Sequence, residues 1–219
     1  MREDSGYLGV GIEPPVAIGQ RLLVVKTDEG NVLWDMIPLV DDAALEAVRA
    51  CGEVRAIAIS HPHYYSGMVE WSRALGRLQG DDVPILLHEA DREWVQRPDP
   101  AVELWSGDVR ELWGGLTLLR LGGHFAGGTV LHDAGRSTLL SGDIVMVIPD
   151  RRYVSFMWSY PNLIPLPAAE VERIAAALEP WPFERILGAW WDRLVPRGGS
   201  ELVRRSAERY ARALTAPLG

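Results

Sequence analysis

The stretch that decides the fold is Ser60-His61-Pro62-His63-Tyr64-Tyr65-Ser66-Gly67. It directly follows the apolar run from 54 to 59, which has the length and composition of a buried β-strand. Two of the chain's five histidines, His61 and His63, therefore lie where a strand ends. Side chains alternate between the two faces of a strand, so both imidazoles are expected on the same side if the strand geometry continues. Such a pair predicts half of a metal-binding site.

The other half of the predicted site comes later in the chain. His124 lies in the glycine-rich segment 121–128, 61 residues after His63 (124 − 63). Asp143 follows Ser141-Gly142, 19 residues after His124 (143 − 124). Three imidazoles and one carboxylate would fill a four-coordinate site.

The order of these motifs resembles that of the metallo-β-lactamase fold hydrolases. In that family a strand leads into H-x-H-x-D-H, and a Gly-His and then a Ser/Thr-Gly-Asp follow. The resemblance extends from about Leu22 to about Trp191 and implies an α/β fold, a four-layer αββα sandwich forming one domain over residues 1–219. It also implies that one metal is held by His61, His63, His124 and Asp143.

The chain departs from the family pattern at the residues that serve a second metal. Tyr65 and Ser66 stand where the family has aspartate and histidine, and Ala189 or Trp190 stands at its late histidine. The resemblance therefore predicts a mononuclear site. Zinc is the expected divalent metal and iron is the alternative.

Three functions are compatible with this pattern. The first is a metal-dependent hydrolase of an ester, thioester, lactone or amide, with Asp143 and Tyr65 in catalytic roles. Tyr65 is a poor general base at neutral pH but a serviceable hydrogen-bond donor. The second is a decayed relative that binds a ligand or a metal without catalysis. The third is a non-haem iron oxidoreductase of the persulfide dioxygenase type, with His61, His124 and Asp143 as its facial triad.

The substrate is expected to be a small neutral or apolar molecule. The aromatic, proline-punctuated segment 153–165 follows Asp143 and suits the wall of an apolar pocket. The residues predicted to contact the substrate are Tyr64, Ser66, Tyr160 and Trp190.

Composition restricts the partners of the chain. A net charge of −8 argues against nucleic acid, whose phosphates need clustered cations. Lys26 is the single lysine, so a P-loop is absent, and no Gly-x-Ser-x-Gly elbow is present. With only Cys51 and no apolar run of membrane-spanning length, we expect a cytoplasmic protein without a membrane partner. The oligomeric state is left open, a homo-oligomer included.

Periodicity and capping signals predict alternating strands and helices. His88 and His132 are expected to be structural. The predicted helices are 42–50, 67–78, 89–95, 167–178 and 200–214. The predicted strands are 21–26, 31–35, 54–59, 84–87, 116–121, 129–133, 137–140 and 185–188.

Overall fold

A computed structural model describes residues 1–4 and 6–215 of the chain. The chain divides into two compact units, and each is described by itself. Unit 1 comprises residues 1–107 together with 189–191, and unit 2 comprises residues 108–188 together with 192–219. The expectation of one domain over residues 1–219 stays a prediction.

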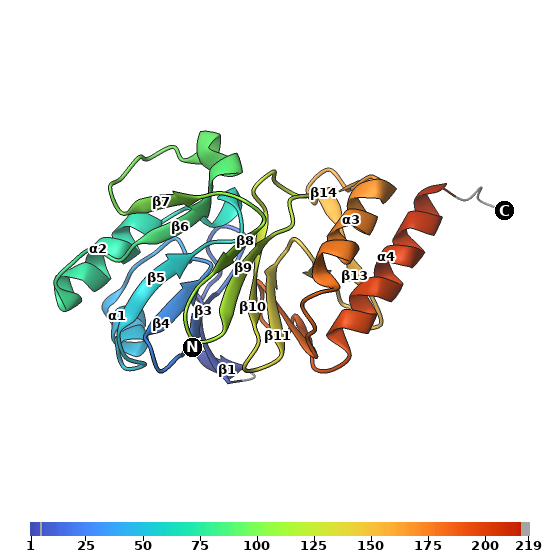
Figure 1. Cartoon of the computed structure of the whole chain (residues 1–219). Helices are drawn as coiled ribbons and strands as arrows, with labels where there is room; N and C mark the ends of the chain where they lie inside the picture. The colour runs from blue at the N-terminus through green and yellow to red at the C-terminus, as the bar shows by residue number, and fades with distance from the viewer. Residues whose placement is uncertain (5, 216–219) are drawn as a thin grey trace. The chain divides into compact units, whose positions relative to one another are not determined.

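Unit 1 is built on a seven-stranded sheet whose strands follow one another in chain order. The first four strands pair antiparallel, and the connections from β4 onward are parallel (Figure 1). Parallel neighbours need crossover segments, which here carry the helices. The strands are β1 (Arg2–Asp4), β2 (Tyr7–Val10), β3 (Leu22–Val25), β4 (Asn31–Trp34), β5 (Val54–Ala58), β6 (Ile85–His88) and β7 (Val102–Trp105).

Two α-helices and two 3-10 helices complete unit 1. Helix α1 (Asp42–Arg49) begins where the Asp41 carboxylate accepts a hydrogen bond from the backbone N–H of Ala44, at 2.7 Å. Helix α2 (Met68–Gln79) buries one face, including Trp71 and Leu75, and ends at a glycine. The short helices are η1 (Pro62–Tyr64) and η2 (Glu89–Trp94).

Unit 2 is built on a six-stranded sheet with the order β17-β16-β11-β10-β9-β8. Strands β8 to β11 form an antiparallel meander, whereas β16 pairs parallel to β11. The strands are β8 (Val109–Glu111), β9 (Leu116–Arg120), β10 (Thr129–Asp133), β11 (Thr138–Gly142), β16 (Arg185–Gly188) and β17 (Leu194–Val195).

Helices α3 (Ala168–Leu178) and α4 (Gly199–Thr215) pack against each other in unit 2 (Figure 1). Their apolar faces join the sheet in one buried cluster that includes Ile174, Ile186 and Val203. Two small hairpins lie between β11 and α3. They pair β12 (Met146–Val147) with β13 (Val154–Ser155) and β14 (Met157–Ser159) with β15 (Ile164–Pro165).

The mixed α/β fold predicted from the sequence is confirmed, and the predicted helices and main strands lie within a few residues of their observed bounds. Two small hairpins and five other strands were not predicted from periodicity: β1, β2, β7, β8 and β17. Most of these strands have only 2 or 3 residues, which is too few to display an alternating pattern. No helix in the described residues is both long and apolar enough to cross a bilayer.

Candidate metal centre

The first pair of predicted ligands lies directly after β5, but not on an extended strand. Strand β5 ends at Ala58, and Pro62 to Tyr64 form the 3-10 helix η1 with His61 as its N-cap residue. The strand geometry therefore does not continue through His63, because Pro62 begins a helical turn at the position that proline favours. The two imidazoles nevertheless come together, with ring centroids 5.0 Å apart.

His61 is held from behind by two residues of unit 1. Its Nδ1 lies 2.9 Å from Ser60 Oγ, and the Ser60 backbone N–H donates to Asp35 Oδ1 at 2.8 Å. With Nδ1 engaged in this way, Nε2 is the nitrogen that can donate to a metal. Asp35 was not among the residues predicted from the sequence. Its signal was weak: one acidic residue at the end of a four-residue buried strand.

Residue 35 is an unusual position for a carboxylate. The side chain is 1% exposed, and its backbone adopts a left-handed φ of 58°. Burial raises the pKa of Asp35 to about 7, and the hydrogen bonds from Ser60 oppose that shift only in part. The group therefore takes up a proton far more readily than an exposed aspartate.

Burial sets the protonation states of His63 and Tyr65, which follow His61 in the chain. His63 is the exposed member of the ligand pair, yet partial burial of its ring lowers its pKa, which favours the neutral imidazole that a metal requires. Tyr65 packs against the core of unit 1. Burial and the neighbouring Asp91 raise its pKa well above the usual value, so the phenol keeps its proton. Tyr65 can donate a hydrogen bond but cannot serve as a base.

Tyr64 and Ser66 differ in exposure. Tyr64 is fully buried in the core, and its ring lies 4.4 Å from that of His61 in an edge-on contact. This differs from the predicted substrate contact, because the turn of η1 directs Tyr64 inward, where it supports the His61 ring. Ser66 is exposed, and its contact with a substrate stays a prediction.

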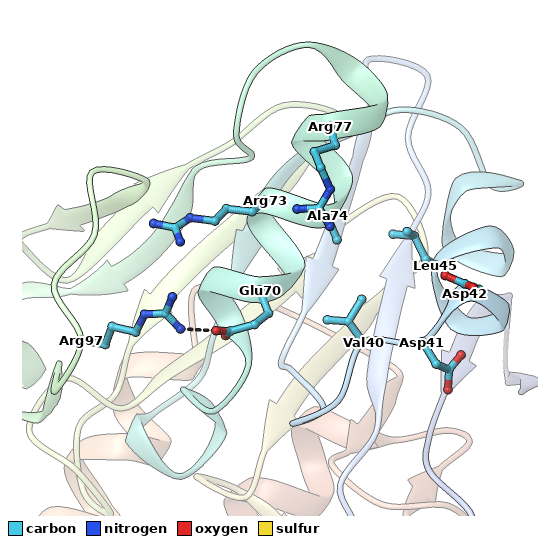
Figure 2. A pocket seen from close by; sticks show the side chains of 9 residues that line it. All are labelled: Val40, Asp41, Asp42, Leu45, Glu70, Arg73, Ala74, Arg77 and Arg97. Carbon is cyan, nitrogen blue, oxygen red and sulfur yellow. Dashed lines mark hydrogen bonds and ion pairs between the residues drawn. The ribbon is translucent and has the colours of Figure 1, made fainter.

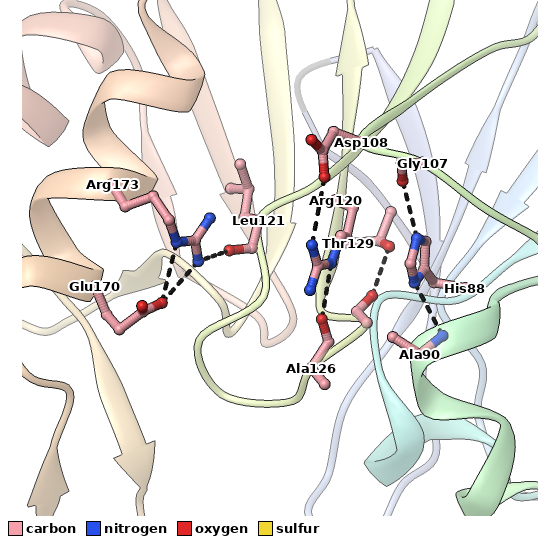
Figure 3. Close-up of polar contacts among 11 residues, drawn as sticks. His88, Ala90, Gly107, Asp108, Arg120, Leu121, Ala126, Thr129, Glu170 and Arg173 are labelled. Atoms are coloured by element: carbon pink, nitrogen blue, oxygen red, sulfur yellow. Dashed lines mark hydrogen bonds and ion pairs between the residues drawn. The ribbon is translucent and has the colours of Figure 1, made fainter.

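The second pair of predicted ligands lies in unit 2, and its loop is braced from both ends. Arg120 Nε donates to the carbonyl of Ala126 at 2.9 Å, and Arg173 Nη2 donates to the carbonyl of Leu121 at 2.5 Å (Figure 3). The hydroxyl of Thr129 donates to the carbonyl of Gly127 at 2.8 Å. These contacts fix the backbone of the glycine-rich segment 121–128 that carries His124.

Gly123 shows why this loop needs glycine. Its φ is +84°, and an added Cβ would lie 3.0 Å from both Ile174 and Leu166. A side chain there would be strained by its backbone conformation and crowded by the helix α3 behind it. The glycine beside His124 therefore lets the loop pass close to the core of unit 2.

The tautomer of His124 is set by a main-chain contact. His124 Nδ1 lies 2.9 Å from the carbonyl oxygen of Trp158. A carbonyl can only accept, so Nδ1 carries the proton and Nε2 presents its lone pair. That nitrogen lies 3.9 Å from Asp143 Oδ2, too long for a hydrogen bond. The separation is near the roughly 3.3 Å expected of two ligands on one tetrahedral zinc.

Asp143 is positioned by the end of β11. A bulge interrupts the pairing of β11 with β16 between Leu140 and Gly142, directly before the aspartate. The Tyr160 hydroxyl donates to the backbone carbonyl of Asp143 at 2.7 Å. Burial and Asp143 raise the pKa of Tyr160, so this donor stays protonated. Tyr160 thus contacts a predicted ligand, and its substrate contact stays a prediction.

Residues 189–191 include the position of the family's late histidine, and they belong to unit 1. Ala189 is 3% exposed within the hydrophobic core, and its carbonyl accepts from the backbone N–H of Arg21 at 2.9 Å. Trp190 Nε1 donates to the carbonyl of Ile18 at 2.8 Å. The ring of Trp191 contacts the guanidinium groups of Arg2 and Arg21, at 4.5 and 5.1 Å from its centroid.

These contacts describe the position at which the family's late histidine would bind a second metal. The Ala189 side chain lies among apolar neighbours, so residue 189 is a core position. Trp190 is partly buried against the same core, and its predicted contact with a substrate stays a prediction. A Cβ at Gly9 would lie 2.8 Å from the Trp191 ring, so β2 approaches this segment as closely as a glycine allows.

His88 and His132 have structural contacts, as predicted. His88 Nδ1 accepts from the backbone N–H of Ala90 at 3.2 Å, and Nε2 donates to the carbonyl of Gly107 at 2.9 Å (Figure 3). His132 Nε2 donates to the carbonyl of Pro182 at 3.0 Å. Each ring therefore ties one segment of its unit to another.

A separate pocket of about 430 Å³ lies between α1 and α2 in unit 1 (Figure 2). Its charged groups are mixed, and Arg97 forms an ion pair with Glu70 across it. None of the predicted site residues lines it. The lining residues are Val40, Asp41, Asp42, Leu45, Glu70, Arg73, Ala74, Arg77 and Arg97.

Comparisons with known proteins agree with the arrangement described above. The chain is 44% identical to the uncharacterized protein YmaE of Bacillus subtilis (strain 168), over 99% of this chain and 78% of that one. No family model matches the sequence.

Among solved structures, the metallo-β-lactamase FIM-1 from Pseudomonas aeruginosa in its mono-zinc form is similar, with a TM-score of 0.64. It is 16% identical, and the match covers 94% of this chain and 90% of that one. TTHA1623 in a di-iron-bound form is similar with a TM-score of 0.60 and 22% identity, over 91% of this chain and 98% of that one. These likenesses show a shared fold.

Proposed function

This chain belongs to the same family as YmaE and has the metallo-β-lactamase fold, and we propose on that basis that it is a metal-dependent hydrolase with a single divalent metal. The proposed ligands are His61, His63, His124 and Asp143, which offer three imidazole nitrogens and one carboxylate oxygen. The proposed substrate carries an ester, thioester, lactone or amide bond on a small neutral or apolar molecule.

The observation that carries this proposal is that contacts within each unit already orient the imidazoles of the candidate ligands. His61 and His124 both engage Nδ1 with a neighbouring oxygen, at 2.9 Å in each case, which leaves Nε2 as the donor to a metal. The lowered pKa of His63 favours its neutral form. Structural histidines such as His132, which donates from Nε2, have the opposite arrangement.

The donor set suits zinc and also accommodates iron. Imidazole nitrogens and a carboxylate oxygen are common ligands of both metals. When bound, such a metal supplies the Lewis acidity that polarises a carbonyl and lowers the pKa of a coordinated water. Zinc is proposed first, since FIM-1 in its mono-zinc form has this fold.

The side chains around the proposed ligands have separate roles. Tyr65 keeps its proton because burial raises its pKa, so it donates a hydrogen bond to the carbonyl oxygen of the substrate. Asp143 would hold the metal and is the carboxylate in the set that could accept a proton. Tyr160 fixes the backbone of Asp143 through its hydroxyl. In the family, an aspartate orients the attacking water. Tyr65 stands at that position here, so we expect slow turnover.

Iron chemistry is the second candidate, because TTHA1623 with the same fold occurs in a di-iron-bound form. His61, His124 and Asp143 are the two imidazoles and one carboxylate that a facial triad requires. In that case the activity would be oxidation of a persulfide by oxygen rather than hydrolysis.

The test begins with protein purified without chelator. Elemental analysis should give close to one zinc or iron per chain. Hydrolysis of p-nitrophenyl esters, thioesters, lactones and a β-lactam should fall on chelation and return when one equivalent of zinc is added. Full occupancy by two metals per chain would contradict the single-metal proposal. A loaded protein that hydrolyses none of these compounds, but consumes oxygen with glutathione persulfide, would favour the iron alternative.

A further inference from the structure

The hairpin formed by β14 and β15 exposes an unusual amount of apolar surface. Trp158 is 56% exposed, Leu163 is 79% exposed and Ile164 is 39% exposed. No charged residue occurs from 153 to 169, although 24% of the chain is charged. Most exposed apolar residues of a protein occur singly, so three of them on one short hairpin make it a candidate binding surface.

The two strands direct their side chains to different environments. The Tyr210 hydroxyl of α4 lies 3.4 Å from Met157 Sδ, so Met157 faces that helix. Trp158 lies at the irregularity in the pairing of β14 with β15, between Met157 and Ser159, and it is 56% exposed. Packing within unit 2 therefore explains Met157 but not Trp158.

Leu163 is difficult to explain as a structural residue. Its φ is 55°, in the left-handed region that leucine rarely adopts, and its backbone N–H closes a turn onto the carbonyl of Tyr160 at 3.2 Å. The exposed side chain gains almost no burial to offset this conformation. Glycine or asparagine would suit the turn better, so leucine at 163 indicates a contact with something outside the chain.

The hairpin is tied to both candidate ligands of unit 2. The carbonyl of Trp158 accepts from His124 Nδ1 at 2.9 Å, and the Tyr160 hydroxyl donates to the carbonyl of Asp143 at 2.7 Å. An apolar group bound on the hairpin would thus be linked to a group held at His124 and Asp143. This continuity distinguishes the surface from an isolated apolar patch.

We propose that Trp158, Leu163 and Ile164 bind the apolar chain of the substrate, which makes that substrate a medium- or long-chain acyl compound. This inference rests on the proposed function and assigns its specificity. The uncharged character of residues 153–169 fits a hydrocarbon chain and disfavours a charged one. Each methylene that becomes buried should tighten binding by up to about fourfold.

The test compares acyl chain lengths in the zinc-loaded full chain. With p-nitrophenyl esters from acetate to decanoate, kcat/KM should rise with length in the parent. Trp158→Ala and Leu163→Asn should flatten that rise, so that the ratio of kcat/KM for decanoate to that for acetate falls in each variant. Leu78→Ala removes another exposed leucine, 48% exposed on α2, and should behave like the parent. Equal slopes in the parent and in Trp158→Ala would overturn the proposal.

A binding measurement separates this inference from the proposed function. Calorimetry should show decanoate binding at least tenfold more tightly than hexanoate, with the difference lost in Trp158→Ala, even if no ester is hydrolysed. Ester hydrolysis without any chain-length dependence would leave the hydrolase standing and reject the acyl site. Two further outcomes would also reject it: a parent dimer that Leu163→Asp makes monomeric, or cosedimentation with phosphatidylcholine vesicles that the same variant loses.

Discussion

The two pairs of candidate ligands are held in different ways, although both present imidazoles through Nε2. In unit 1, His61 is backed by side chains: Ser60 contacts its Nδ1, and Asp35 holds the backbone of Ser60. In unit 2, His124 is backed by the main-chain carbonyl of Trp158. Substitution can therefore alter the support of the first pair directly. The support of the second pair depends on the backbone course of a hairpin and resists single substitutions.

The largest effect should come from removing a ligand from either pair. His61→Ala and His124→Ala should each abolish metal retention, because a site with four protein ligands has no spare one. His88→Ala and His132→Ala are matched controls and should keep the metal content of the parent. Elemental analysis after gel filtration measures this. Loss of metal in His88→Ala as complete as in His61→Ala would reject the ligand assignment.

The next effect concerns the buried carboxylate behind the first pair. The pKa of Asp35 is raised from 3.8 to about 7, so between about pH 4 and pH 7 the unfolded chain loses a proton that the folded protein keeps. The metal-free protein should therefore lose stability as the pH rises through this window, by on the order of 4 kcal/mol, and level off above it.

Asp35→Asn should remove this dependence, because asparagine keeps the shape and tolerates the left-handed φ of 58°. Urea unfolding of the metal-free parent and variant at pH 4, 5, 6 and 7 provides the measurement. Parallel curves for the two proteins across these pH values would show that Asp35 ionises normally. In unit 2, Nδ1 of His124 contacts a main-chain carbonyl, which does not titrate.

A smaller effect is expected at the position of the family's late histidine. Ala189 is 3% exposed in the core of unit 1, so Ala189→His should overpack that core and lower the free energy of unfolding by about 1–3 kcal/mol. The metal content should not rise, even with Tyr65→Asp and Ser66→His added. Urea unfolding and elemental analysis measure the two effects. A second equivalent of metal in the triple variant would show that missing side chains alone exclude it.

The smallest effect sharpens the contrast between side-chain and main-chain support. Ser60→Ala removes the oxygen beside His61 Nδ1 and should weaken zinc affinity by about tenfold, measured by competition with a chromophoric chelator. Trp158→Ala leaves its carbonyl in place and should keep the affinity of the parent. If Trp158→Ala weakens zinc binding as much as Ser60→Ala does, the hairpin backbone depends on that side chain.

Much of the fold and most of the candidate ligand set could be predicted from the sequence. Long periodic segments such as 68–79 and strongly apolar runs such as 54–58 carry enough positions to reveal their structure. The candidate ligands His61, His63, His124 and Asp143 could be predicted because they occur in recognisable motifs. The helix η1 was not predicted: Pro62 turns the chain one residue after His61, and three residues are too few to show a helical period.

The supporting residues could not be predicted for a physical reason. The role of Asp35 depends on a contact with Ser60, 25 residues away, and that contact leaves no local pattern. The carbonyl of Trp158 supports His124 through the main chain, which the identity of the residue does not reveal. The inward course of Tyr64 depends on the turn of η1 and on the core behind it.

The membership of residues 189–191 in unit 1 has a consequence for how the protein is made. The core of unit 1 consists of residues 1–107 completed by Ala189, and Trp191 contacts Arg2 and Arg21 near the start of the chain. During synthesis, the first 107 residues leave the ribosome without the segment that finishes their core. The core of unit 1 can therefore be completed only after most of unit 2 has been translated. The core of unit 2 needs helix α4, which follows residue 191, so the two cores are completed at nearly the same time, at the end of synthesis.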